Sequence, residues 1–190
     1  MMVMWAMGAS VLLGLAGCVG EDSVGSTSSA LLLDVDVALT QADGGEDDGT
    51  ILWEILNAGL ADGGEDDGTI LWEILNVAGA TVWEILETTD PTGANRWAIL
   101  DPATGRERCA VADGLLTDTL TAGKVFQAVS GDVYAVGATT PAYVFDGDEV
   151  RRGDGTLLLT TDPAQEGASD GRKLIIAALV AGHCGSAGMP

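Results

Sequence analysis

Short apolar runs separated by turn residues occupy the chain from about residue 81 to its end. Gly, Pro and Asp punctuate these runs, as at residues 101–105, 130–132, 146–148 and 153–155. Turn residues of this kind between apolar runs indicate hairpins. The predicted strands are residues 81–87, 96–100, 106–111, 124–129, 133–136, 142–145, 149–152, 156–160 and 173–180. Their regular spacing predicts a mainly β fold, a small antiparallel meander that forms a sandwich or barrel.

An additional strand is predicted upstream of this region. Leu or Val alternates with Asp over residues 33–37, and Leu39 continues the alternation. Alternation with a period of two is typical of a strand with one buried face. We expect this segment to add to the sheet as an edge strand.

An internal repeat lies between these two regions. Residues 42–57 and 61–76 both read ADGGEDDGTILWEILN, and shorter echoes occur at residues 82–86 and 97–100. Helix and strand stay open for the two copies, because Thr50 can cap a helix whereas the echo at 82–86 is rich in strand-forming residues. Extra residues are tolerated at the periphery better than in a packed core. We therefore expect one copy to be peripheral, and a chain without residues 42–60 to keep its C-terminal domain folded.

The repeated runs also carry most of the tryptophans. Trp53, Trp72, Trp83 and Trp97 each lie within a run of Ile and Leu, which favours the core. The alternative is a surface on which a carbohydrate or peptide stacks.

Charge divides the chain into two halves. The formal net charge is −21, and the first Lys or Arg is Arg96. Phosphate binding needs clustered basic residues, so nucleic acid is not expected as a partner. The acidic segments beside the apolar runs are typical of residues that prevent aggregation.

Calcium binding is the alternative interpretation of these acids. Asp43, Asp47 and Glu54 have part of the spacing of an EF-hand loop, and Asp62, Asp66 and Glu73 repeat it. Gly45 and Asp48 stand where that loop needs an oxygen ligand and a glycine, and the second copy has the same departures. The pattern thus allows weak divalent-cation binding but predicts no specific metal site.

The N-terminus has the features of an export signal. Residues 1–17 are uncharged and apolar, which is short for a membrane-spanning helix. Leu15, Ala16, Gly17 and Cys18 resemble the lipobox of bacterial lipoprotein signal peptides, although no Lys or Arg precedes the apolar run. The resemblance implies cleavage before Cys18, fatty acylation of its thiol with groups such as palmitate, and attachment to a membrane. A plain apolar N-terminal helix, an uncleaved anchor or a misassigned start are the alternatives.

The resemblance also predicts how the chain is organised. We expect a signal helix at 1–17, the lipidated Cys18 and a tether at 18–41, a flexible acidic repeat segment at 42–79, and a β-rich domain at 80–190. The residue after the acylated cysteine is Val19 rather than Asp, which in this family favours the outer membrane of the cell envelope over the inner one.

The remaining cysteines predict a disulfide. Outside the cytoplasm, Cys109 and Cys184 would form a bridge between the hairpin near residue 109 and the last strand. The alternative is two buried thiols. His183 is the only histidine, and we expect it to be exposed rather than catalytic or zinc-binding.

The sequence contains no recognised catalytic motif. We therefore expect no cofactor and no enzymatic activity, and predict a lipid-anchored envelope protein with a binding or structural role. Its protein or glycan partner is not specified. A secreted hydrolase with an unrecognised carboxylate pair is the alternative.

Overall fold

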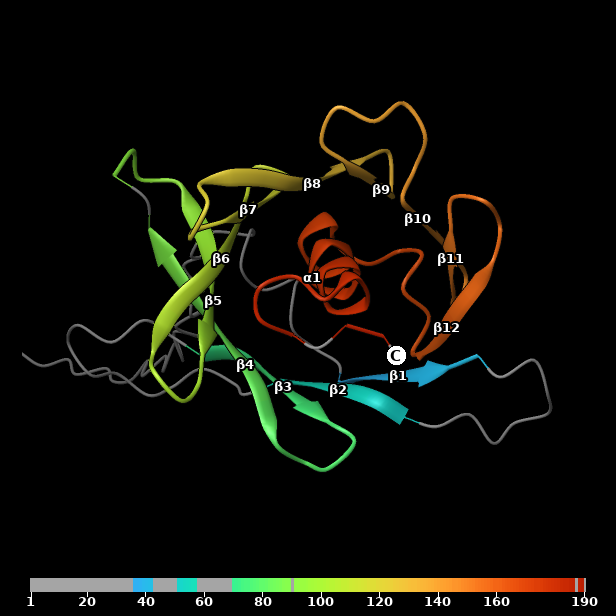
Figure 1. Ribbon diagram of the computed structural model, residues 1–190, viewed down its shortest axis with the longest axis horizontal. Helices are drawn as coiled ribbons and strands as arrows, with labels where there is room; N and C mark the ends of the chain where they lie inside the picture. The colour runs from blue at the N-terminus through green and yellow to red at the C-terminus, as the bar shows by residue number, and fades with distance from the viewer. Residues whose placement is uncertain (1–35, 43–50, 58–69, 90, 187, 190) are drawn as a thin grey trace, which may run out of the picture.

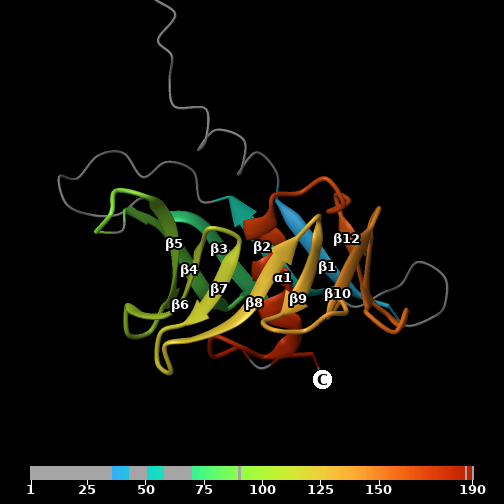
Figure 2. The same ribbon diagram turned by 90° about the horizontal axis from the view of Figure 1, so that it is seen from above.

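The computed structural model describes residues 36–42, 51–57, 70–89, 91–186 and 188–189. These residues form twelve strands and one helix, and the strands make a single closed antiparallel barrel around the helix (Figures 1 and 2). The prediction of a mainly β antiparallel meander is therefore confirmed. Of the two predicted forms, sandwich or barrel, the structure has the barrel. The strands are β1 (Val37–Gln41), β2 (Ile51–Asn57), β3 (Ile70–Asn76), β4 (Thr81–Thr89), β5 (Asn95–Asp101), β6 (Arg106–Ala112), β7 (Leu115–Asp118), β8 (Gly123–Val129), β9 (Asp132–Ala135), β10 (Tyr143–Asp146), β11 (Glu149–Arg152) and β12 (Leu157–Asp162), followed by helix α1 (Asp170–Ala181).

Strand β1 closes the barrel. Each strand pairs with its neighbours along the chain, and β1 pairs antiparallel with both β2 and β12. The expectation of an edge strand at residues 33–39 is therefore wrong for its described part, because β1 has a partner on both sides. Strand β7 at Leu115–Asp118 was not among the predicted strands, since its short run carries little periodic signal.

Helix α1 lies in the centre of the ring of strands (Figure 1). Its buried residues run without interruption from Lys173 to Val180, which is the pattern of a helix enclosed on all sides. The prediction of a strand at 173–180 is therefore wrong. A continuous apolar run alone does not distinguish a buried strand from a buried helix. The residues at the ends of the run make that distinction. Ser169 accepts a hydrogen bond from the Arg172 backbone N–H, and Gly182 ends the helix in the left-handed conformation.

The described part of each repeat copy includes a strand of the barrel wall. Trp53 and Ile55 of β2 and Trp72 and Ile74 of β3 are buried in the core. The expectation that one copy is peripheral is therefore wrong. The barrel wall begins at Val37, so strands from the expected tether and repeat segments share one wall with the strands after residue 80.

Four adjacent strands, β2 to β5, each contribute a tryptophan to the core. Trp53, Trp72, Trp83 and Trp97 are all buried, as the core interpretation predicted, and Trp72 meets Trp97 edge to face with 4.8 Å between ring centroids. Gly171 allows this packing, because a Cβ atom there would lie 2.0 Å from the Trp97 ring. The close approach of helix and wall therefore depends on the absence of a side chain at this position.

The number of strands is constrained by closure. Neighbouring strands run in opposite directions at every pairing around the ring. A closed ring of this kind needs an even number of strands, because an odd number leaves one parallel pair. One repeat unit contains one strand, so its removal changes twelve strands to eleven and makes β1 parallel to β12.

We therefore expect deletion of residues 42–60 to prevent antiparallel closure, which replaces the expectation from the sequence that the shortened chain stays folded. The shortened chain should lose the cooperative unfolding transition of the parent, measured by near-ultraviolet circular dichroism during heating. Deletion of residues 44–47 is the control, because it shortens a connection and leaves all strands in place. A deletion of 42–60 that unfolds as cooperatively as the control would contradict the closure argument.

Candidate functional site

The interior of the barrel is a packed core. Inward side chains of the wall and the apolar residues of α1 form one buried cluster. Any binding site among the described residues therefore lies on the surface. Two hollows open there, one at each rim of the barrel. We call the rim where α1 begins the entry rim and the rim where it ends the exit rim.

Lys173 fixes the start of α1 to the barrel. Its side chain is 3% exposed, and its Nζ atom donates hydrogen bonds to the carbonyl oxygens of Gly131 at 2.9 Å and Glu166 at 2.5 Å. The ammonium group also lies 5.4 Å from the centroid of the Phe145 ring. A buried charge needs such partners to offset its lost hydration. Lys173 was not predicted from the sequence as a functional or structural site, although a lysine at the start of an apolar run indicates a buried ammonium group.

A cavity of about 300 Å³ lies at the entry rim, beside Trp97. Three carboxylates line it, from Glu87, Asp113 and Asp170. Each also has a role in the fold. Glu87 accepts a hydrogen bond from the Asn95 side chain at 3.0 Å, Asp113 occupies a turn with a φ of 51°, and Asp170 lies in the first turn of α1, where a negative charge is favourable.

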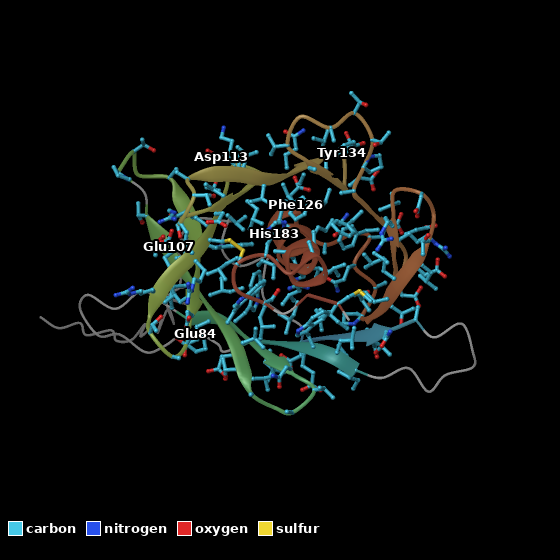
Figure 3. The ribbon with its side chains drawn as sticks, in the orientation of Figure 1. Glu84, Glu107, Asp113, Phe126, Tyr134 and His183 are labelled. Atoms are coloured by element: carbon cyan, nitrogen blue, oxygen red, sulfur yellow. A yellow bond between two sulfur atoms is a disulfide. The ribbon has the colours of Figure 1, made fainter. Side chains whose placement is uncertain are left out.

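Aromatic side chains gather at the exit rim. The Phe126 ring meets Tyr143 at 5.8 Å and His183 at 5.4 Å between centroids, both edge to face. Figure 3 shows Phe126 and His183 within the ring of strands. His183 is partly buried, so the expectation of an exposed histidine is wrong. Burial raises the pKa of the Tyr143 hydroxyl, with an opposing effect of the nearby Arg152 charge.

An open hollow of about 480 Å³ lies near Tyr143. Residues 140–143 and 152–154 line it. Two chain segments meet closely here, since a Cβ atom on Gly153 would lie 1.9 Å from the Pro141 carbonyl oxygen. The hollow thus lies where the β9–β10 and β11–β12 connections pack against each other at the exit rim.

The disulfide connects the wall to the end of α1. The sulfur atoms of Cys109 on β6 and Cys184 after α1 are bonded, as the sequence predicted. The bridge ends in the segment after a helix rather than on a last strand. The Trp83 indole N–H donates to the Cys184 carbonyl at 3.1 Å. The chain after α1 is therefore held to the wall by a covalent bond and a buried hydrogen bond.

Among the described strands, two ion pairs link β5 with β6, and a third lies within β11. Arg96 pairs with Glu107, Arg108 with Asp101, and Arg151 with Glu149. The hydrogen bond from Arg108 lowers the pKa of the Asp101 carboxyl.

Burial lowers the pKa of the Arg172 guanidinium, which lies 5.6 Å from the centroid of the Trp72 ring.

Several predicted site residues lie outside the described part of the chain. Cys18 and the acids at positions 43, 47, 62 and 66 are among them, so lipidation and cation binding stay predictions. Glu54 and Glu73 are described, and lie in the middle of β2 and β3. Among the described residues, no group of three or more His, Cys, Asp or Glu is arranged to hold a metal ion.

Comparisons with known proteins give no relatives. No protein-family model, no curated protein and no solved structure matches this chain. In the part of the chain that the structure describes, there is no helix with the length and apolar character needed to cross a membrane.

We expect loss of the disulfide to lower stability substantially. Cys109 and Cys184 are 75 residues apart, and the loop-entropy model gives about 4 kcal/mol for a closure of that length. The Cys109→Ala/Cys184→Ala variant should therefore unfold at a lower urea concentration, as the reduced parent should. Equal midpoints for the variant and the oxidised parent would contradict this expectation.

We expect Lys173→Met to lower the free energy of unfolding by about 1–3 kcal/mol, because two carbonyl groups lose a charged donor. The measurement is urea unfolding at neutral pH. Lys124→Met is the matched control, since Lys124 is exposed on β8. Similar losses for the two variants would show that the contacts of Lys173 contribute little.

Proposed function

We propose that this chain is a lipid-anchored protein of the bacterial cell envelope with a non-enzymatic binding role. The tether ending at β1 connects the membrane to the barrel, and the outer face of the barrel meets the partner. The Cys109–Cys184 bond is the observation that carries this proposal, because structural disulfides persist in oxidising compartments. It agrees with the export signal that the first 18 residues resemble.

The filled interior favours a role for the outer surface. Residues of α1 from Leu174 to Leu179 have no exposed area, so the helix occupies the space that a ligand would fill in a hollow barrel. A partner then has the rims and the outer wall available.

The entry-rim cavity supports binding more than hydrolysis. A carboxylate-lined cavity is what the hydrolase alternative requires, and Glu87, Asp113 and Asp170 line this one. Their roles in an amide contact, a turn and a helix start account for these residue types without catalysis. Hydrolysis also needs one carboxylate free to act as acid and another to act as base or nucleophile.

Membrane fractionation tests the proposed anchoring. In a bacterial host, the parent chain should be recovered with membranes, and its mature N-terminus should be Cys18 bearing acyl mass in the mass spectrometer. Cys18→Ser should carry no acyl mass and should not be cut before residue 18. Cys109→Ser is the control, because its lipidation should match the parent. Recovery of the intact, unacylated parent from the cytosol would refute the proposal.

A further inference from the structure

Glutamates occupy the same place on three adjacent strands. Glu54 on β2, Glu73 on β3 and Glu84 on β4 each lie between two buried core residues. Successive side chains of a strand point to opposite faces, so these glutamates point away from the core. Figure 3 shows Glu84 on the wall strand β4, away from α1.

The strand register brings two of these charges together. Glu73 and Glu84 are direct partners across β3 and β4. Directly opposite side chains have Cβ atoms about 5 Å apart, and like charges at such positions are destabilising. The wall therefore retains a repulsive pair that costs stability.

Leucines surround the glutamates on the same face. Leu56 is the cross-strand partner of Glu73, Leu100 is the partner of Glu84, and Leu75 is the partner of Glu54. All three leucines are partly exposed. We call the outward side chains of these residues the acidic wall, which consists of Glu54, Leu56, Glu73, Leu75, Glu84 and Leu100.

Among the described residues, no ion pair neutralises a glutamate of the acidic wall. The ion pairs there join the arginines at 96, 108 and 151 to other acids. Residues 1–95 contain no Lys or Arg. The chain's own N-terminal segment therefore cannot neutralise the wall, and a second copy presenting the same wall would add repulsion.

We propose that the acidic wall docks a cationic amphipathic segment of another protein, with basic side chains over the glutamates and apolar side chains over the leucines. The wall alternates carboxylates with apolar side chains, so a segment that alternates basic and apolar side chains would complement it in charge and in polarity. The inference deepens the proposed binding role and rests on it.

Peptide binding to the full chain, purified in an uncharged detergent, tests this inference. The probe is a short labelled peptide in which Lys and Leu alternate, measured by fluorescence anisotropy against a detergent blank. A peptide with Ser in place of Leu is the reference of equal charge. The Lys–Leu peptide should bind more tightly than the reference, and its affinity should fall as salt is added.

The Glu73→Gln/Glu84→Gln variant should bind the Lys–Leu peptide roughly 3- to 30-fold more weakly, because two exposed charge contacts are lost. Its melting temperature should rise by roughly 1–4 °C, since the repulsive pair is gone. This rise separates lost binding from misfolding. Asp146→Asn/Asp148→Asn removes equal charge from exposed positions near the turn between β10 and β11, and should change binding by less than about twofold.

Three results would overturn the inference. Equal losses in the two double variants, or no loss in either, would show general attraction to a negative protein. Equal affinity for the two peptides would show that the leucines do not participate. A dimer of the parent that the Glu73→Gln/Glu84→Gln variant abolishes would assign the wall to a second copy. None of these results changes the acyl mass at Cys18, so failure here is distinct from failure of the proposed anchoring.

Discussion

Burial of α1 is the constraint on which the rest of the barrel depends. From Leu174 to Leu179 the helix exposes no area, so every side of it needs an apolar partner. A single sheet can cover only one side, whereas a closed ring covers them all. Inward Trp, Ile, Leu, Val and Phe residues of the wall provide those contacts. The ends of the helix are fixed separately, by Lys173 at its start and by the Cys184 bridge after its end.

A wall of strands also explains how both copies of the internal repeat can contribute side chains to the core. Each repeat unit brings one strand, with its own inward Trp and Ile, together with its own connection. A wall can accept such a unit where a packed core cannot accept isolated extra residues. The even number of described strands lets β1 pair antiparallel with both β2 and β12. The two copies and β1 are therefore structurally interdependent.

The sequence predicted the local elements better than their arrangement. Turn residues and alternation located most of the wall after residue 81, because those signals are local. The sequence predicts a strand at the position of α1 because a fully buried run lacks the polar face that reveals helical periodicity, although Ser169, Asp170 and Gly182 mark the helix ends. The disulfide followed from counting cysteines. The contacts of Lys173 and the rim cavity depend on segments that are distant in the sequence, which no local pattern contains. The pairing of Glu73 with Glu84 depends on the register between β3 and β4, which alternation alone does not fix.

The pair of Glu73 and Glu84 differs from Lys173 and from the paired arginines in having no partner among the described residues that offsets its charge. Buried Lys173 is offset by two carbonyl groups and an aromatic ring, and the arginines at 96, 108 and 151 are offset by acids. Glu73 and Glu84 face each other with no such offset in the described structure. Replacement of either by a neutral side chain would stabilise the strand pair. A binding surface commonly carries such a cost, because the groups that complement a partner are unpaired until the partner arrives. The repulsive pair is therefore better explained by an absent cationic partner than by any requirement of the barrel.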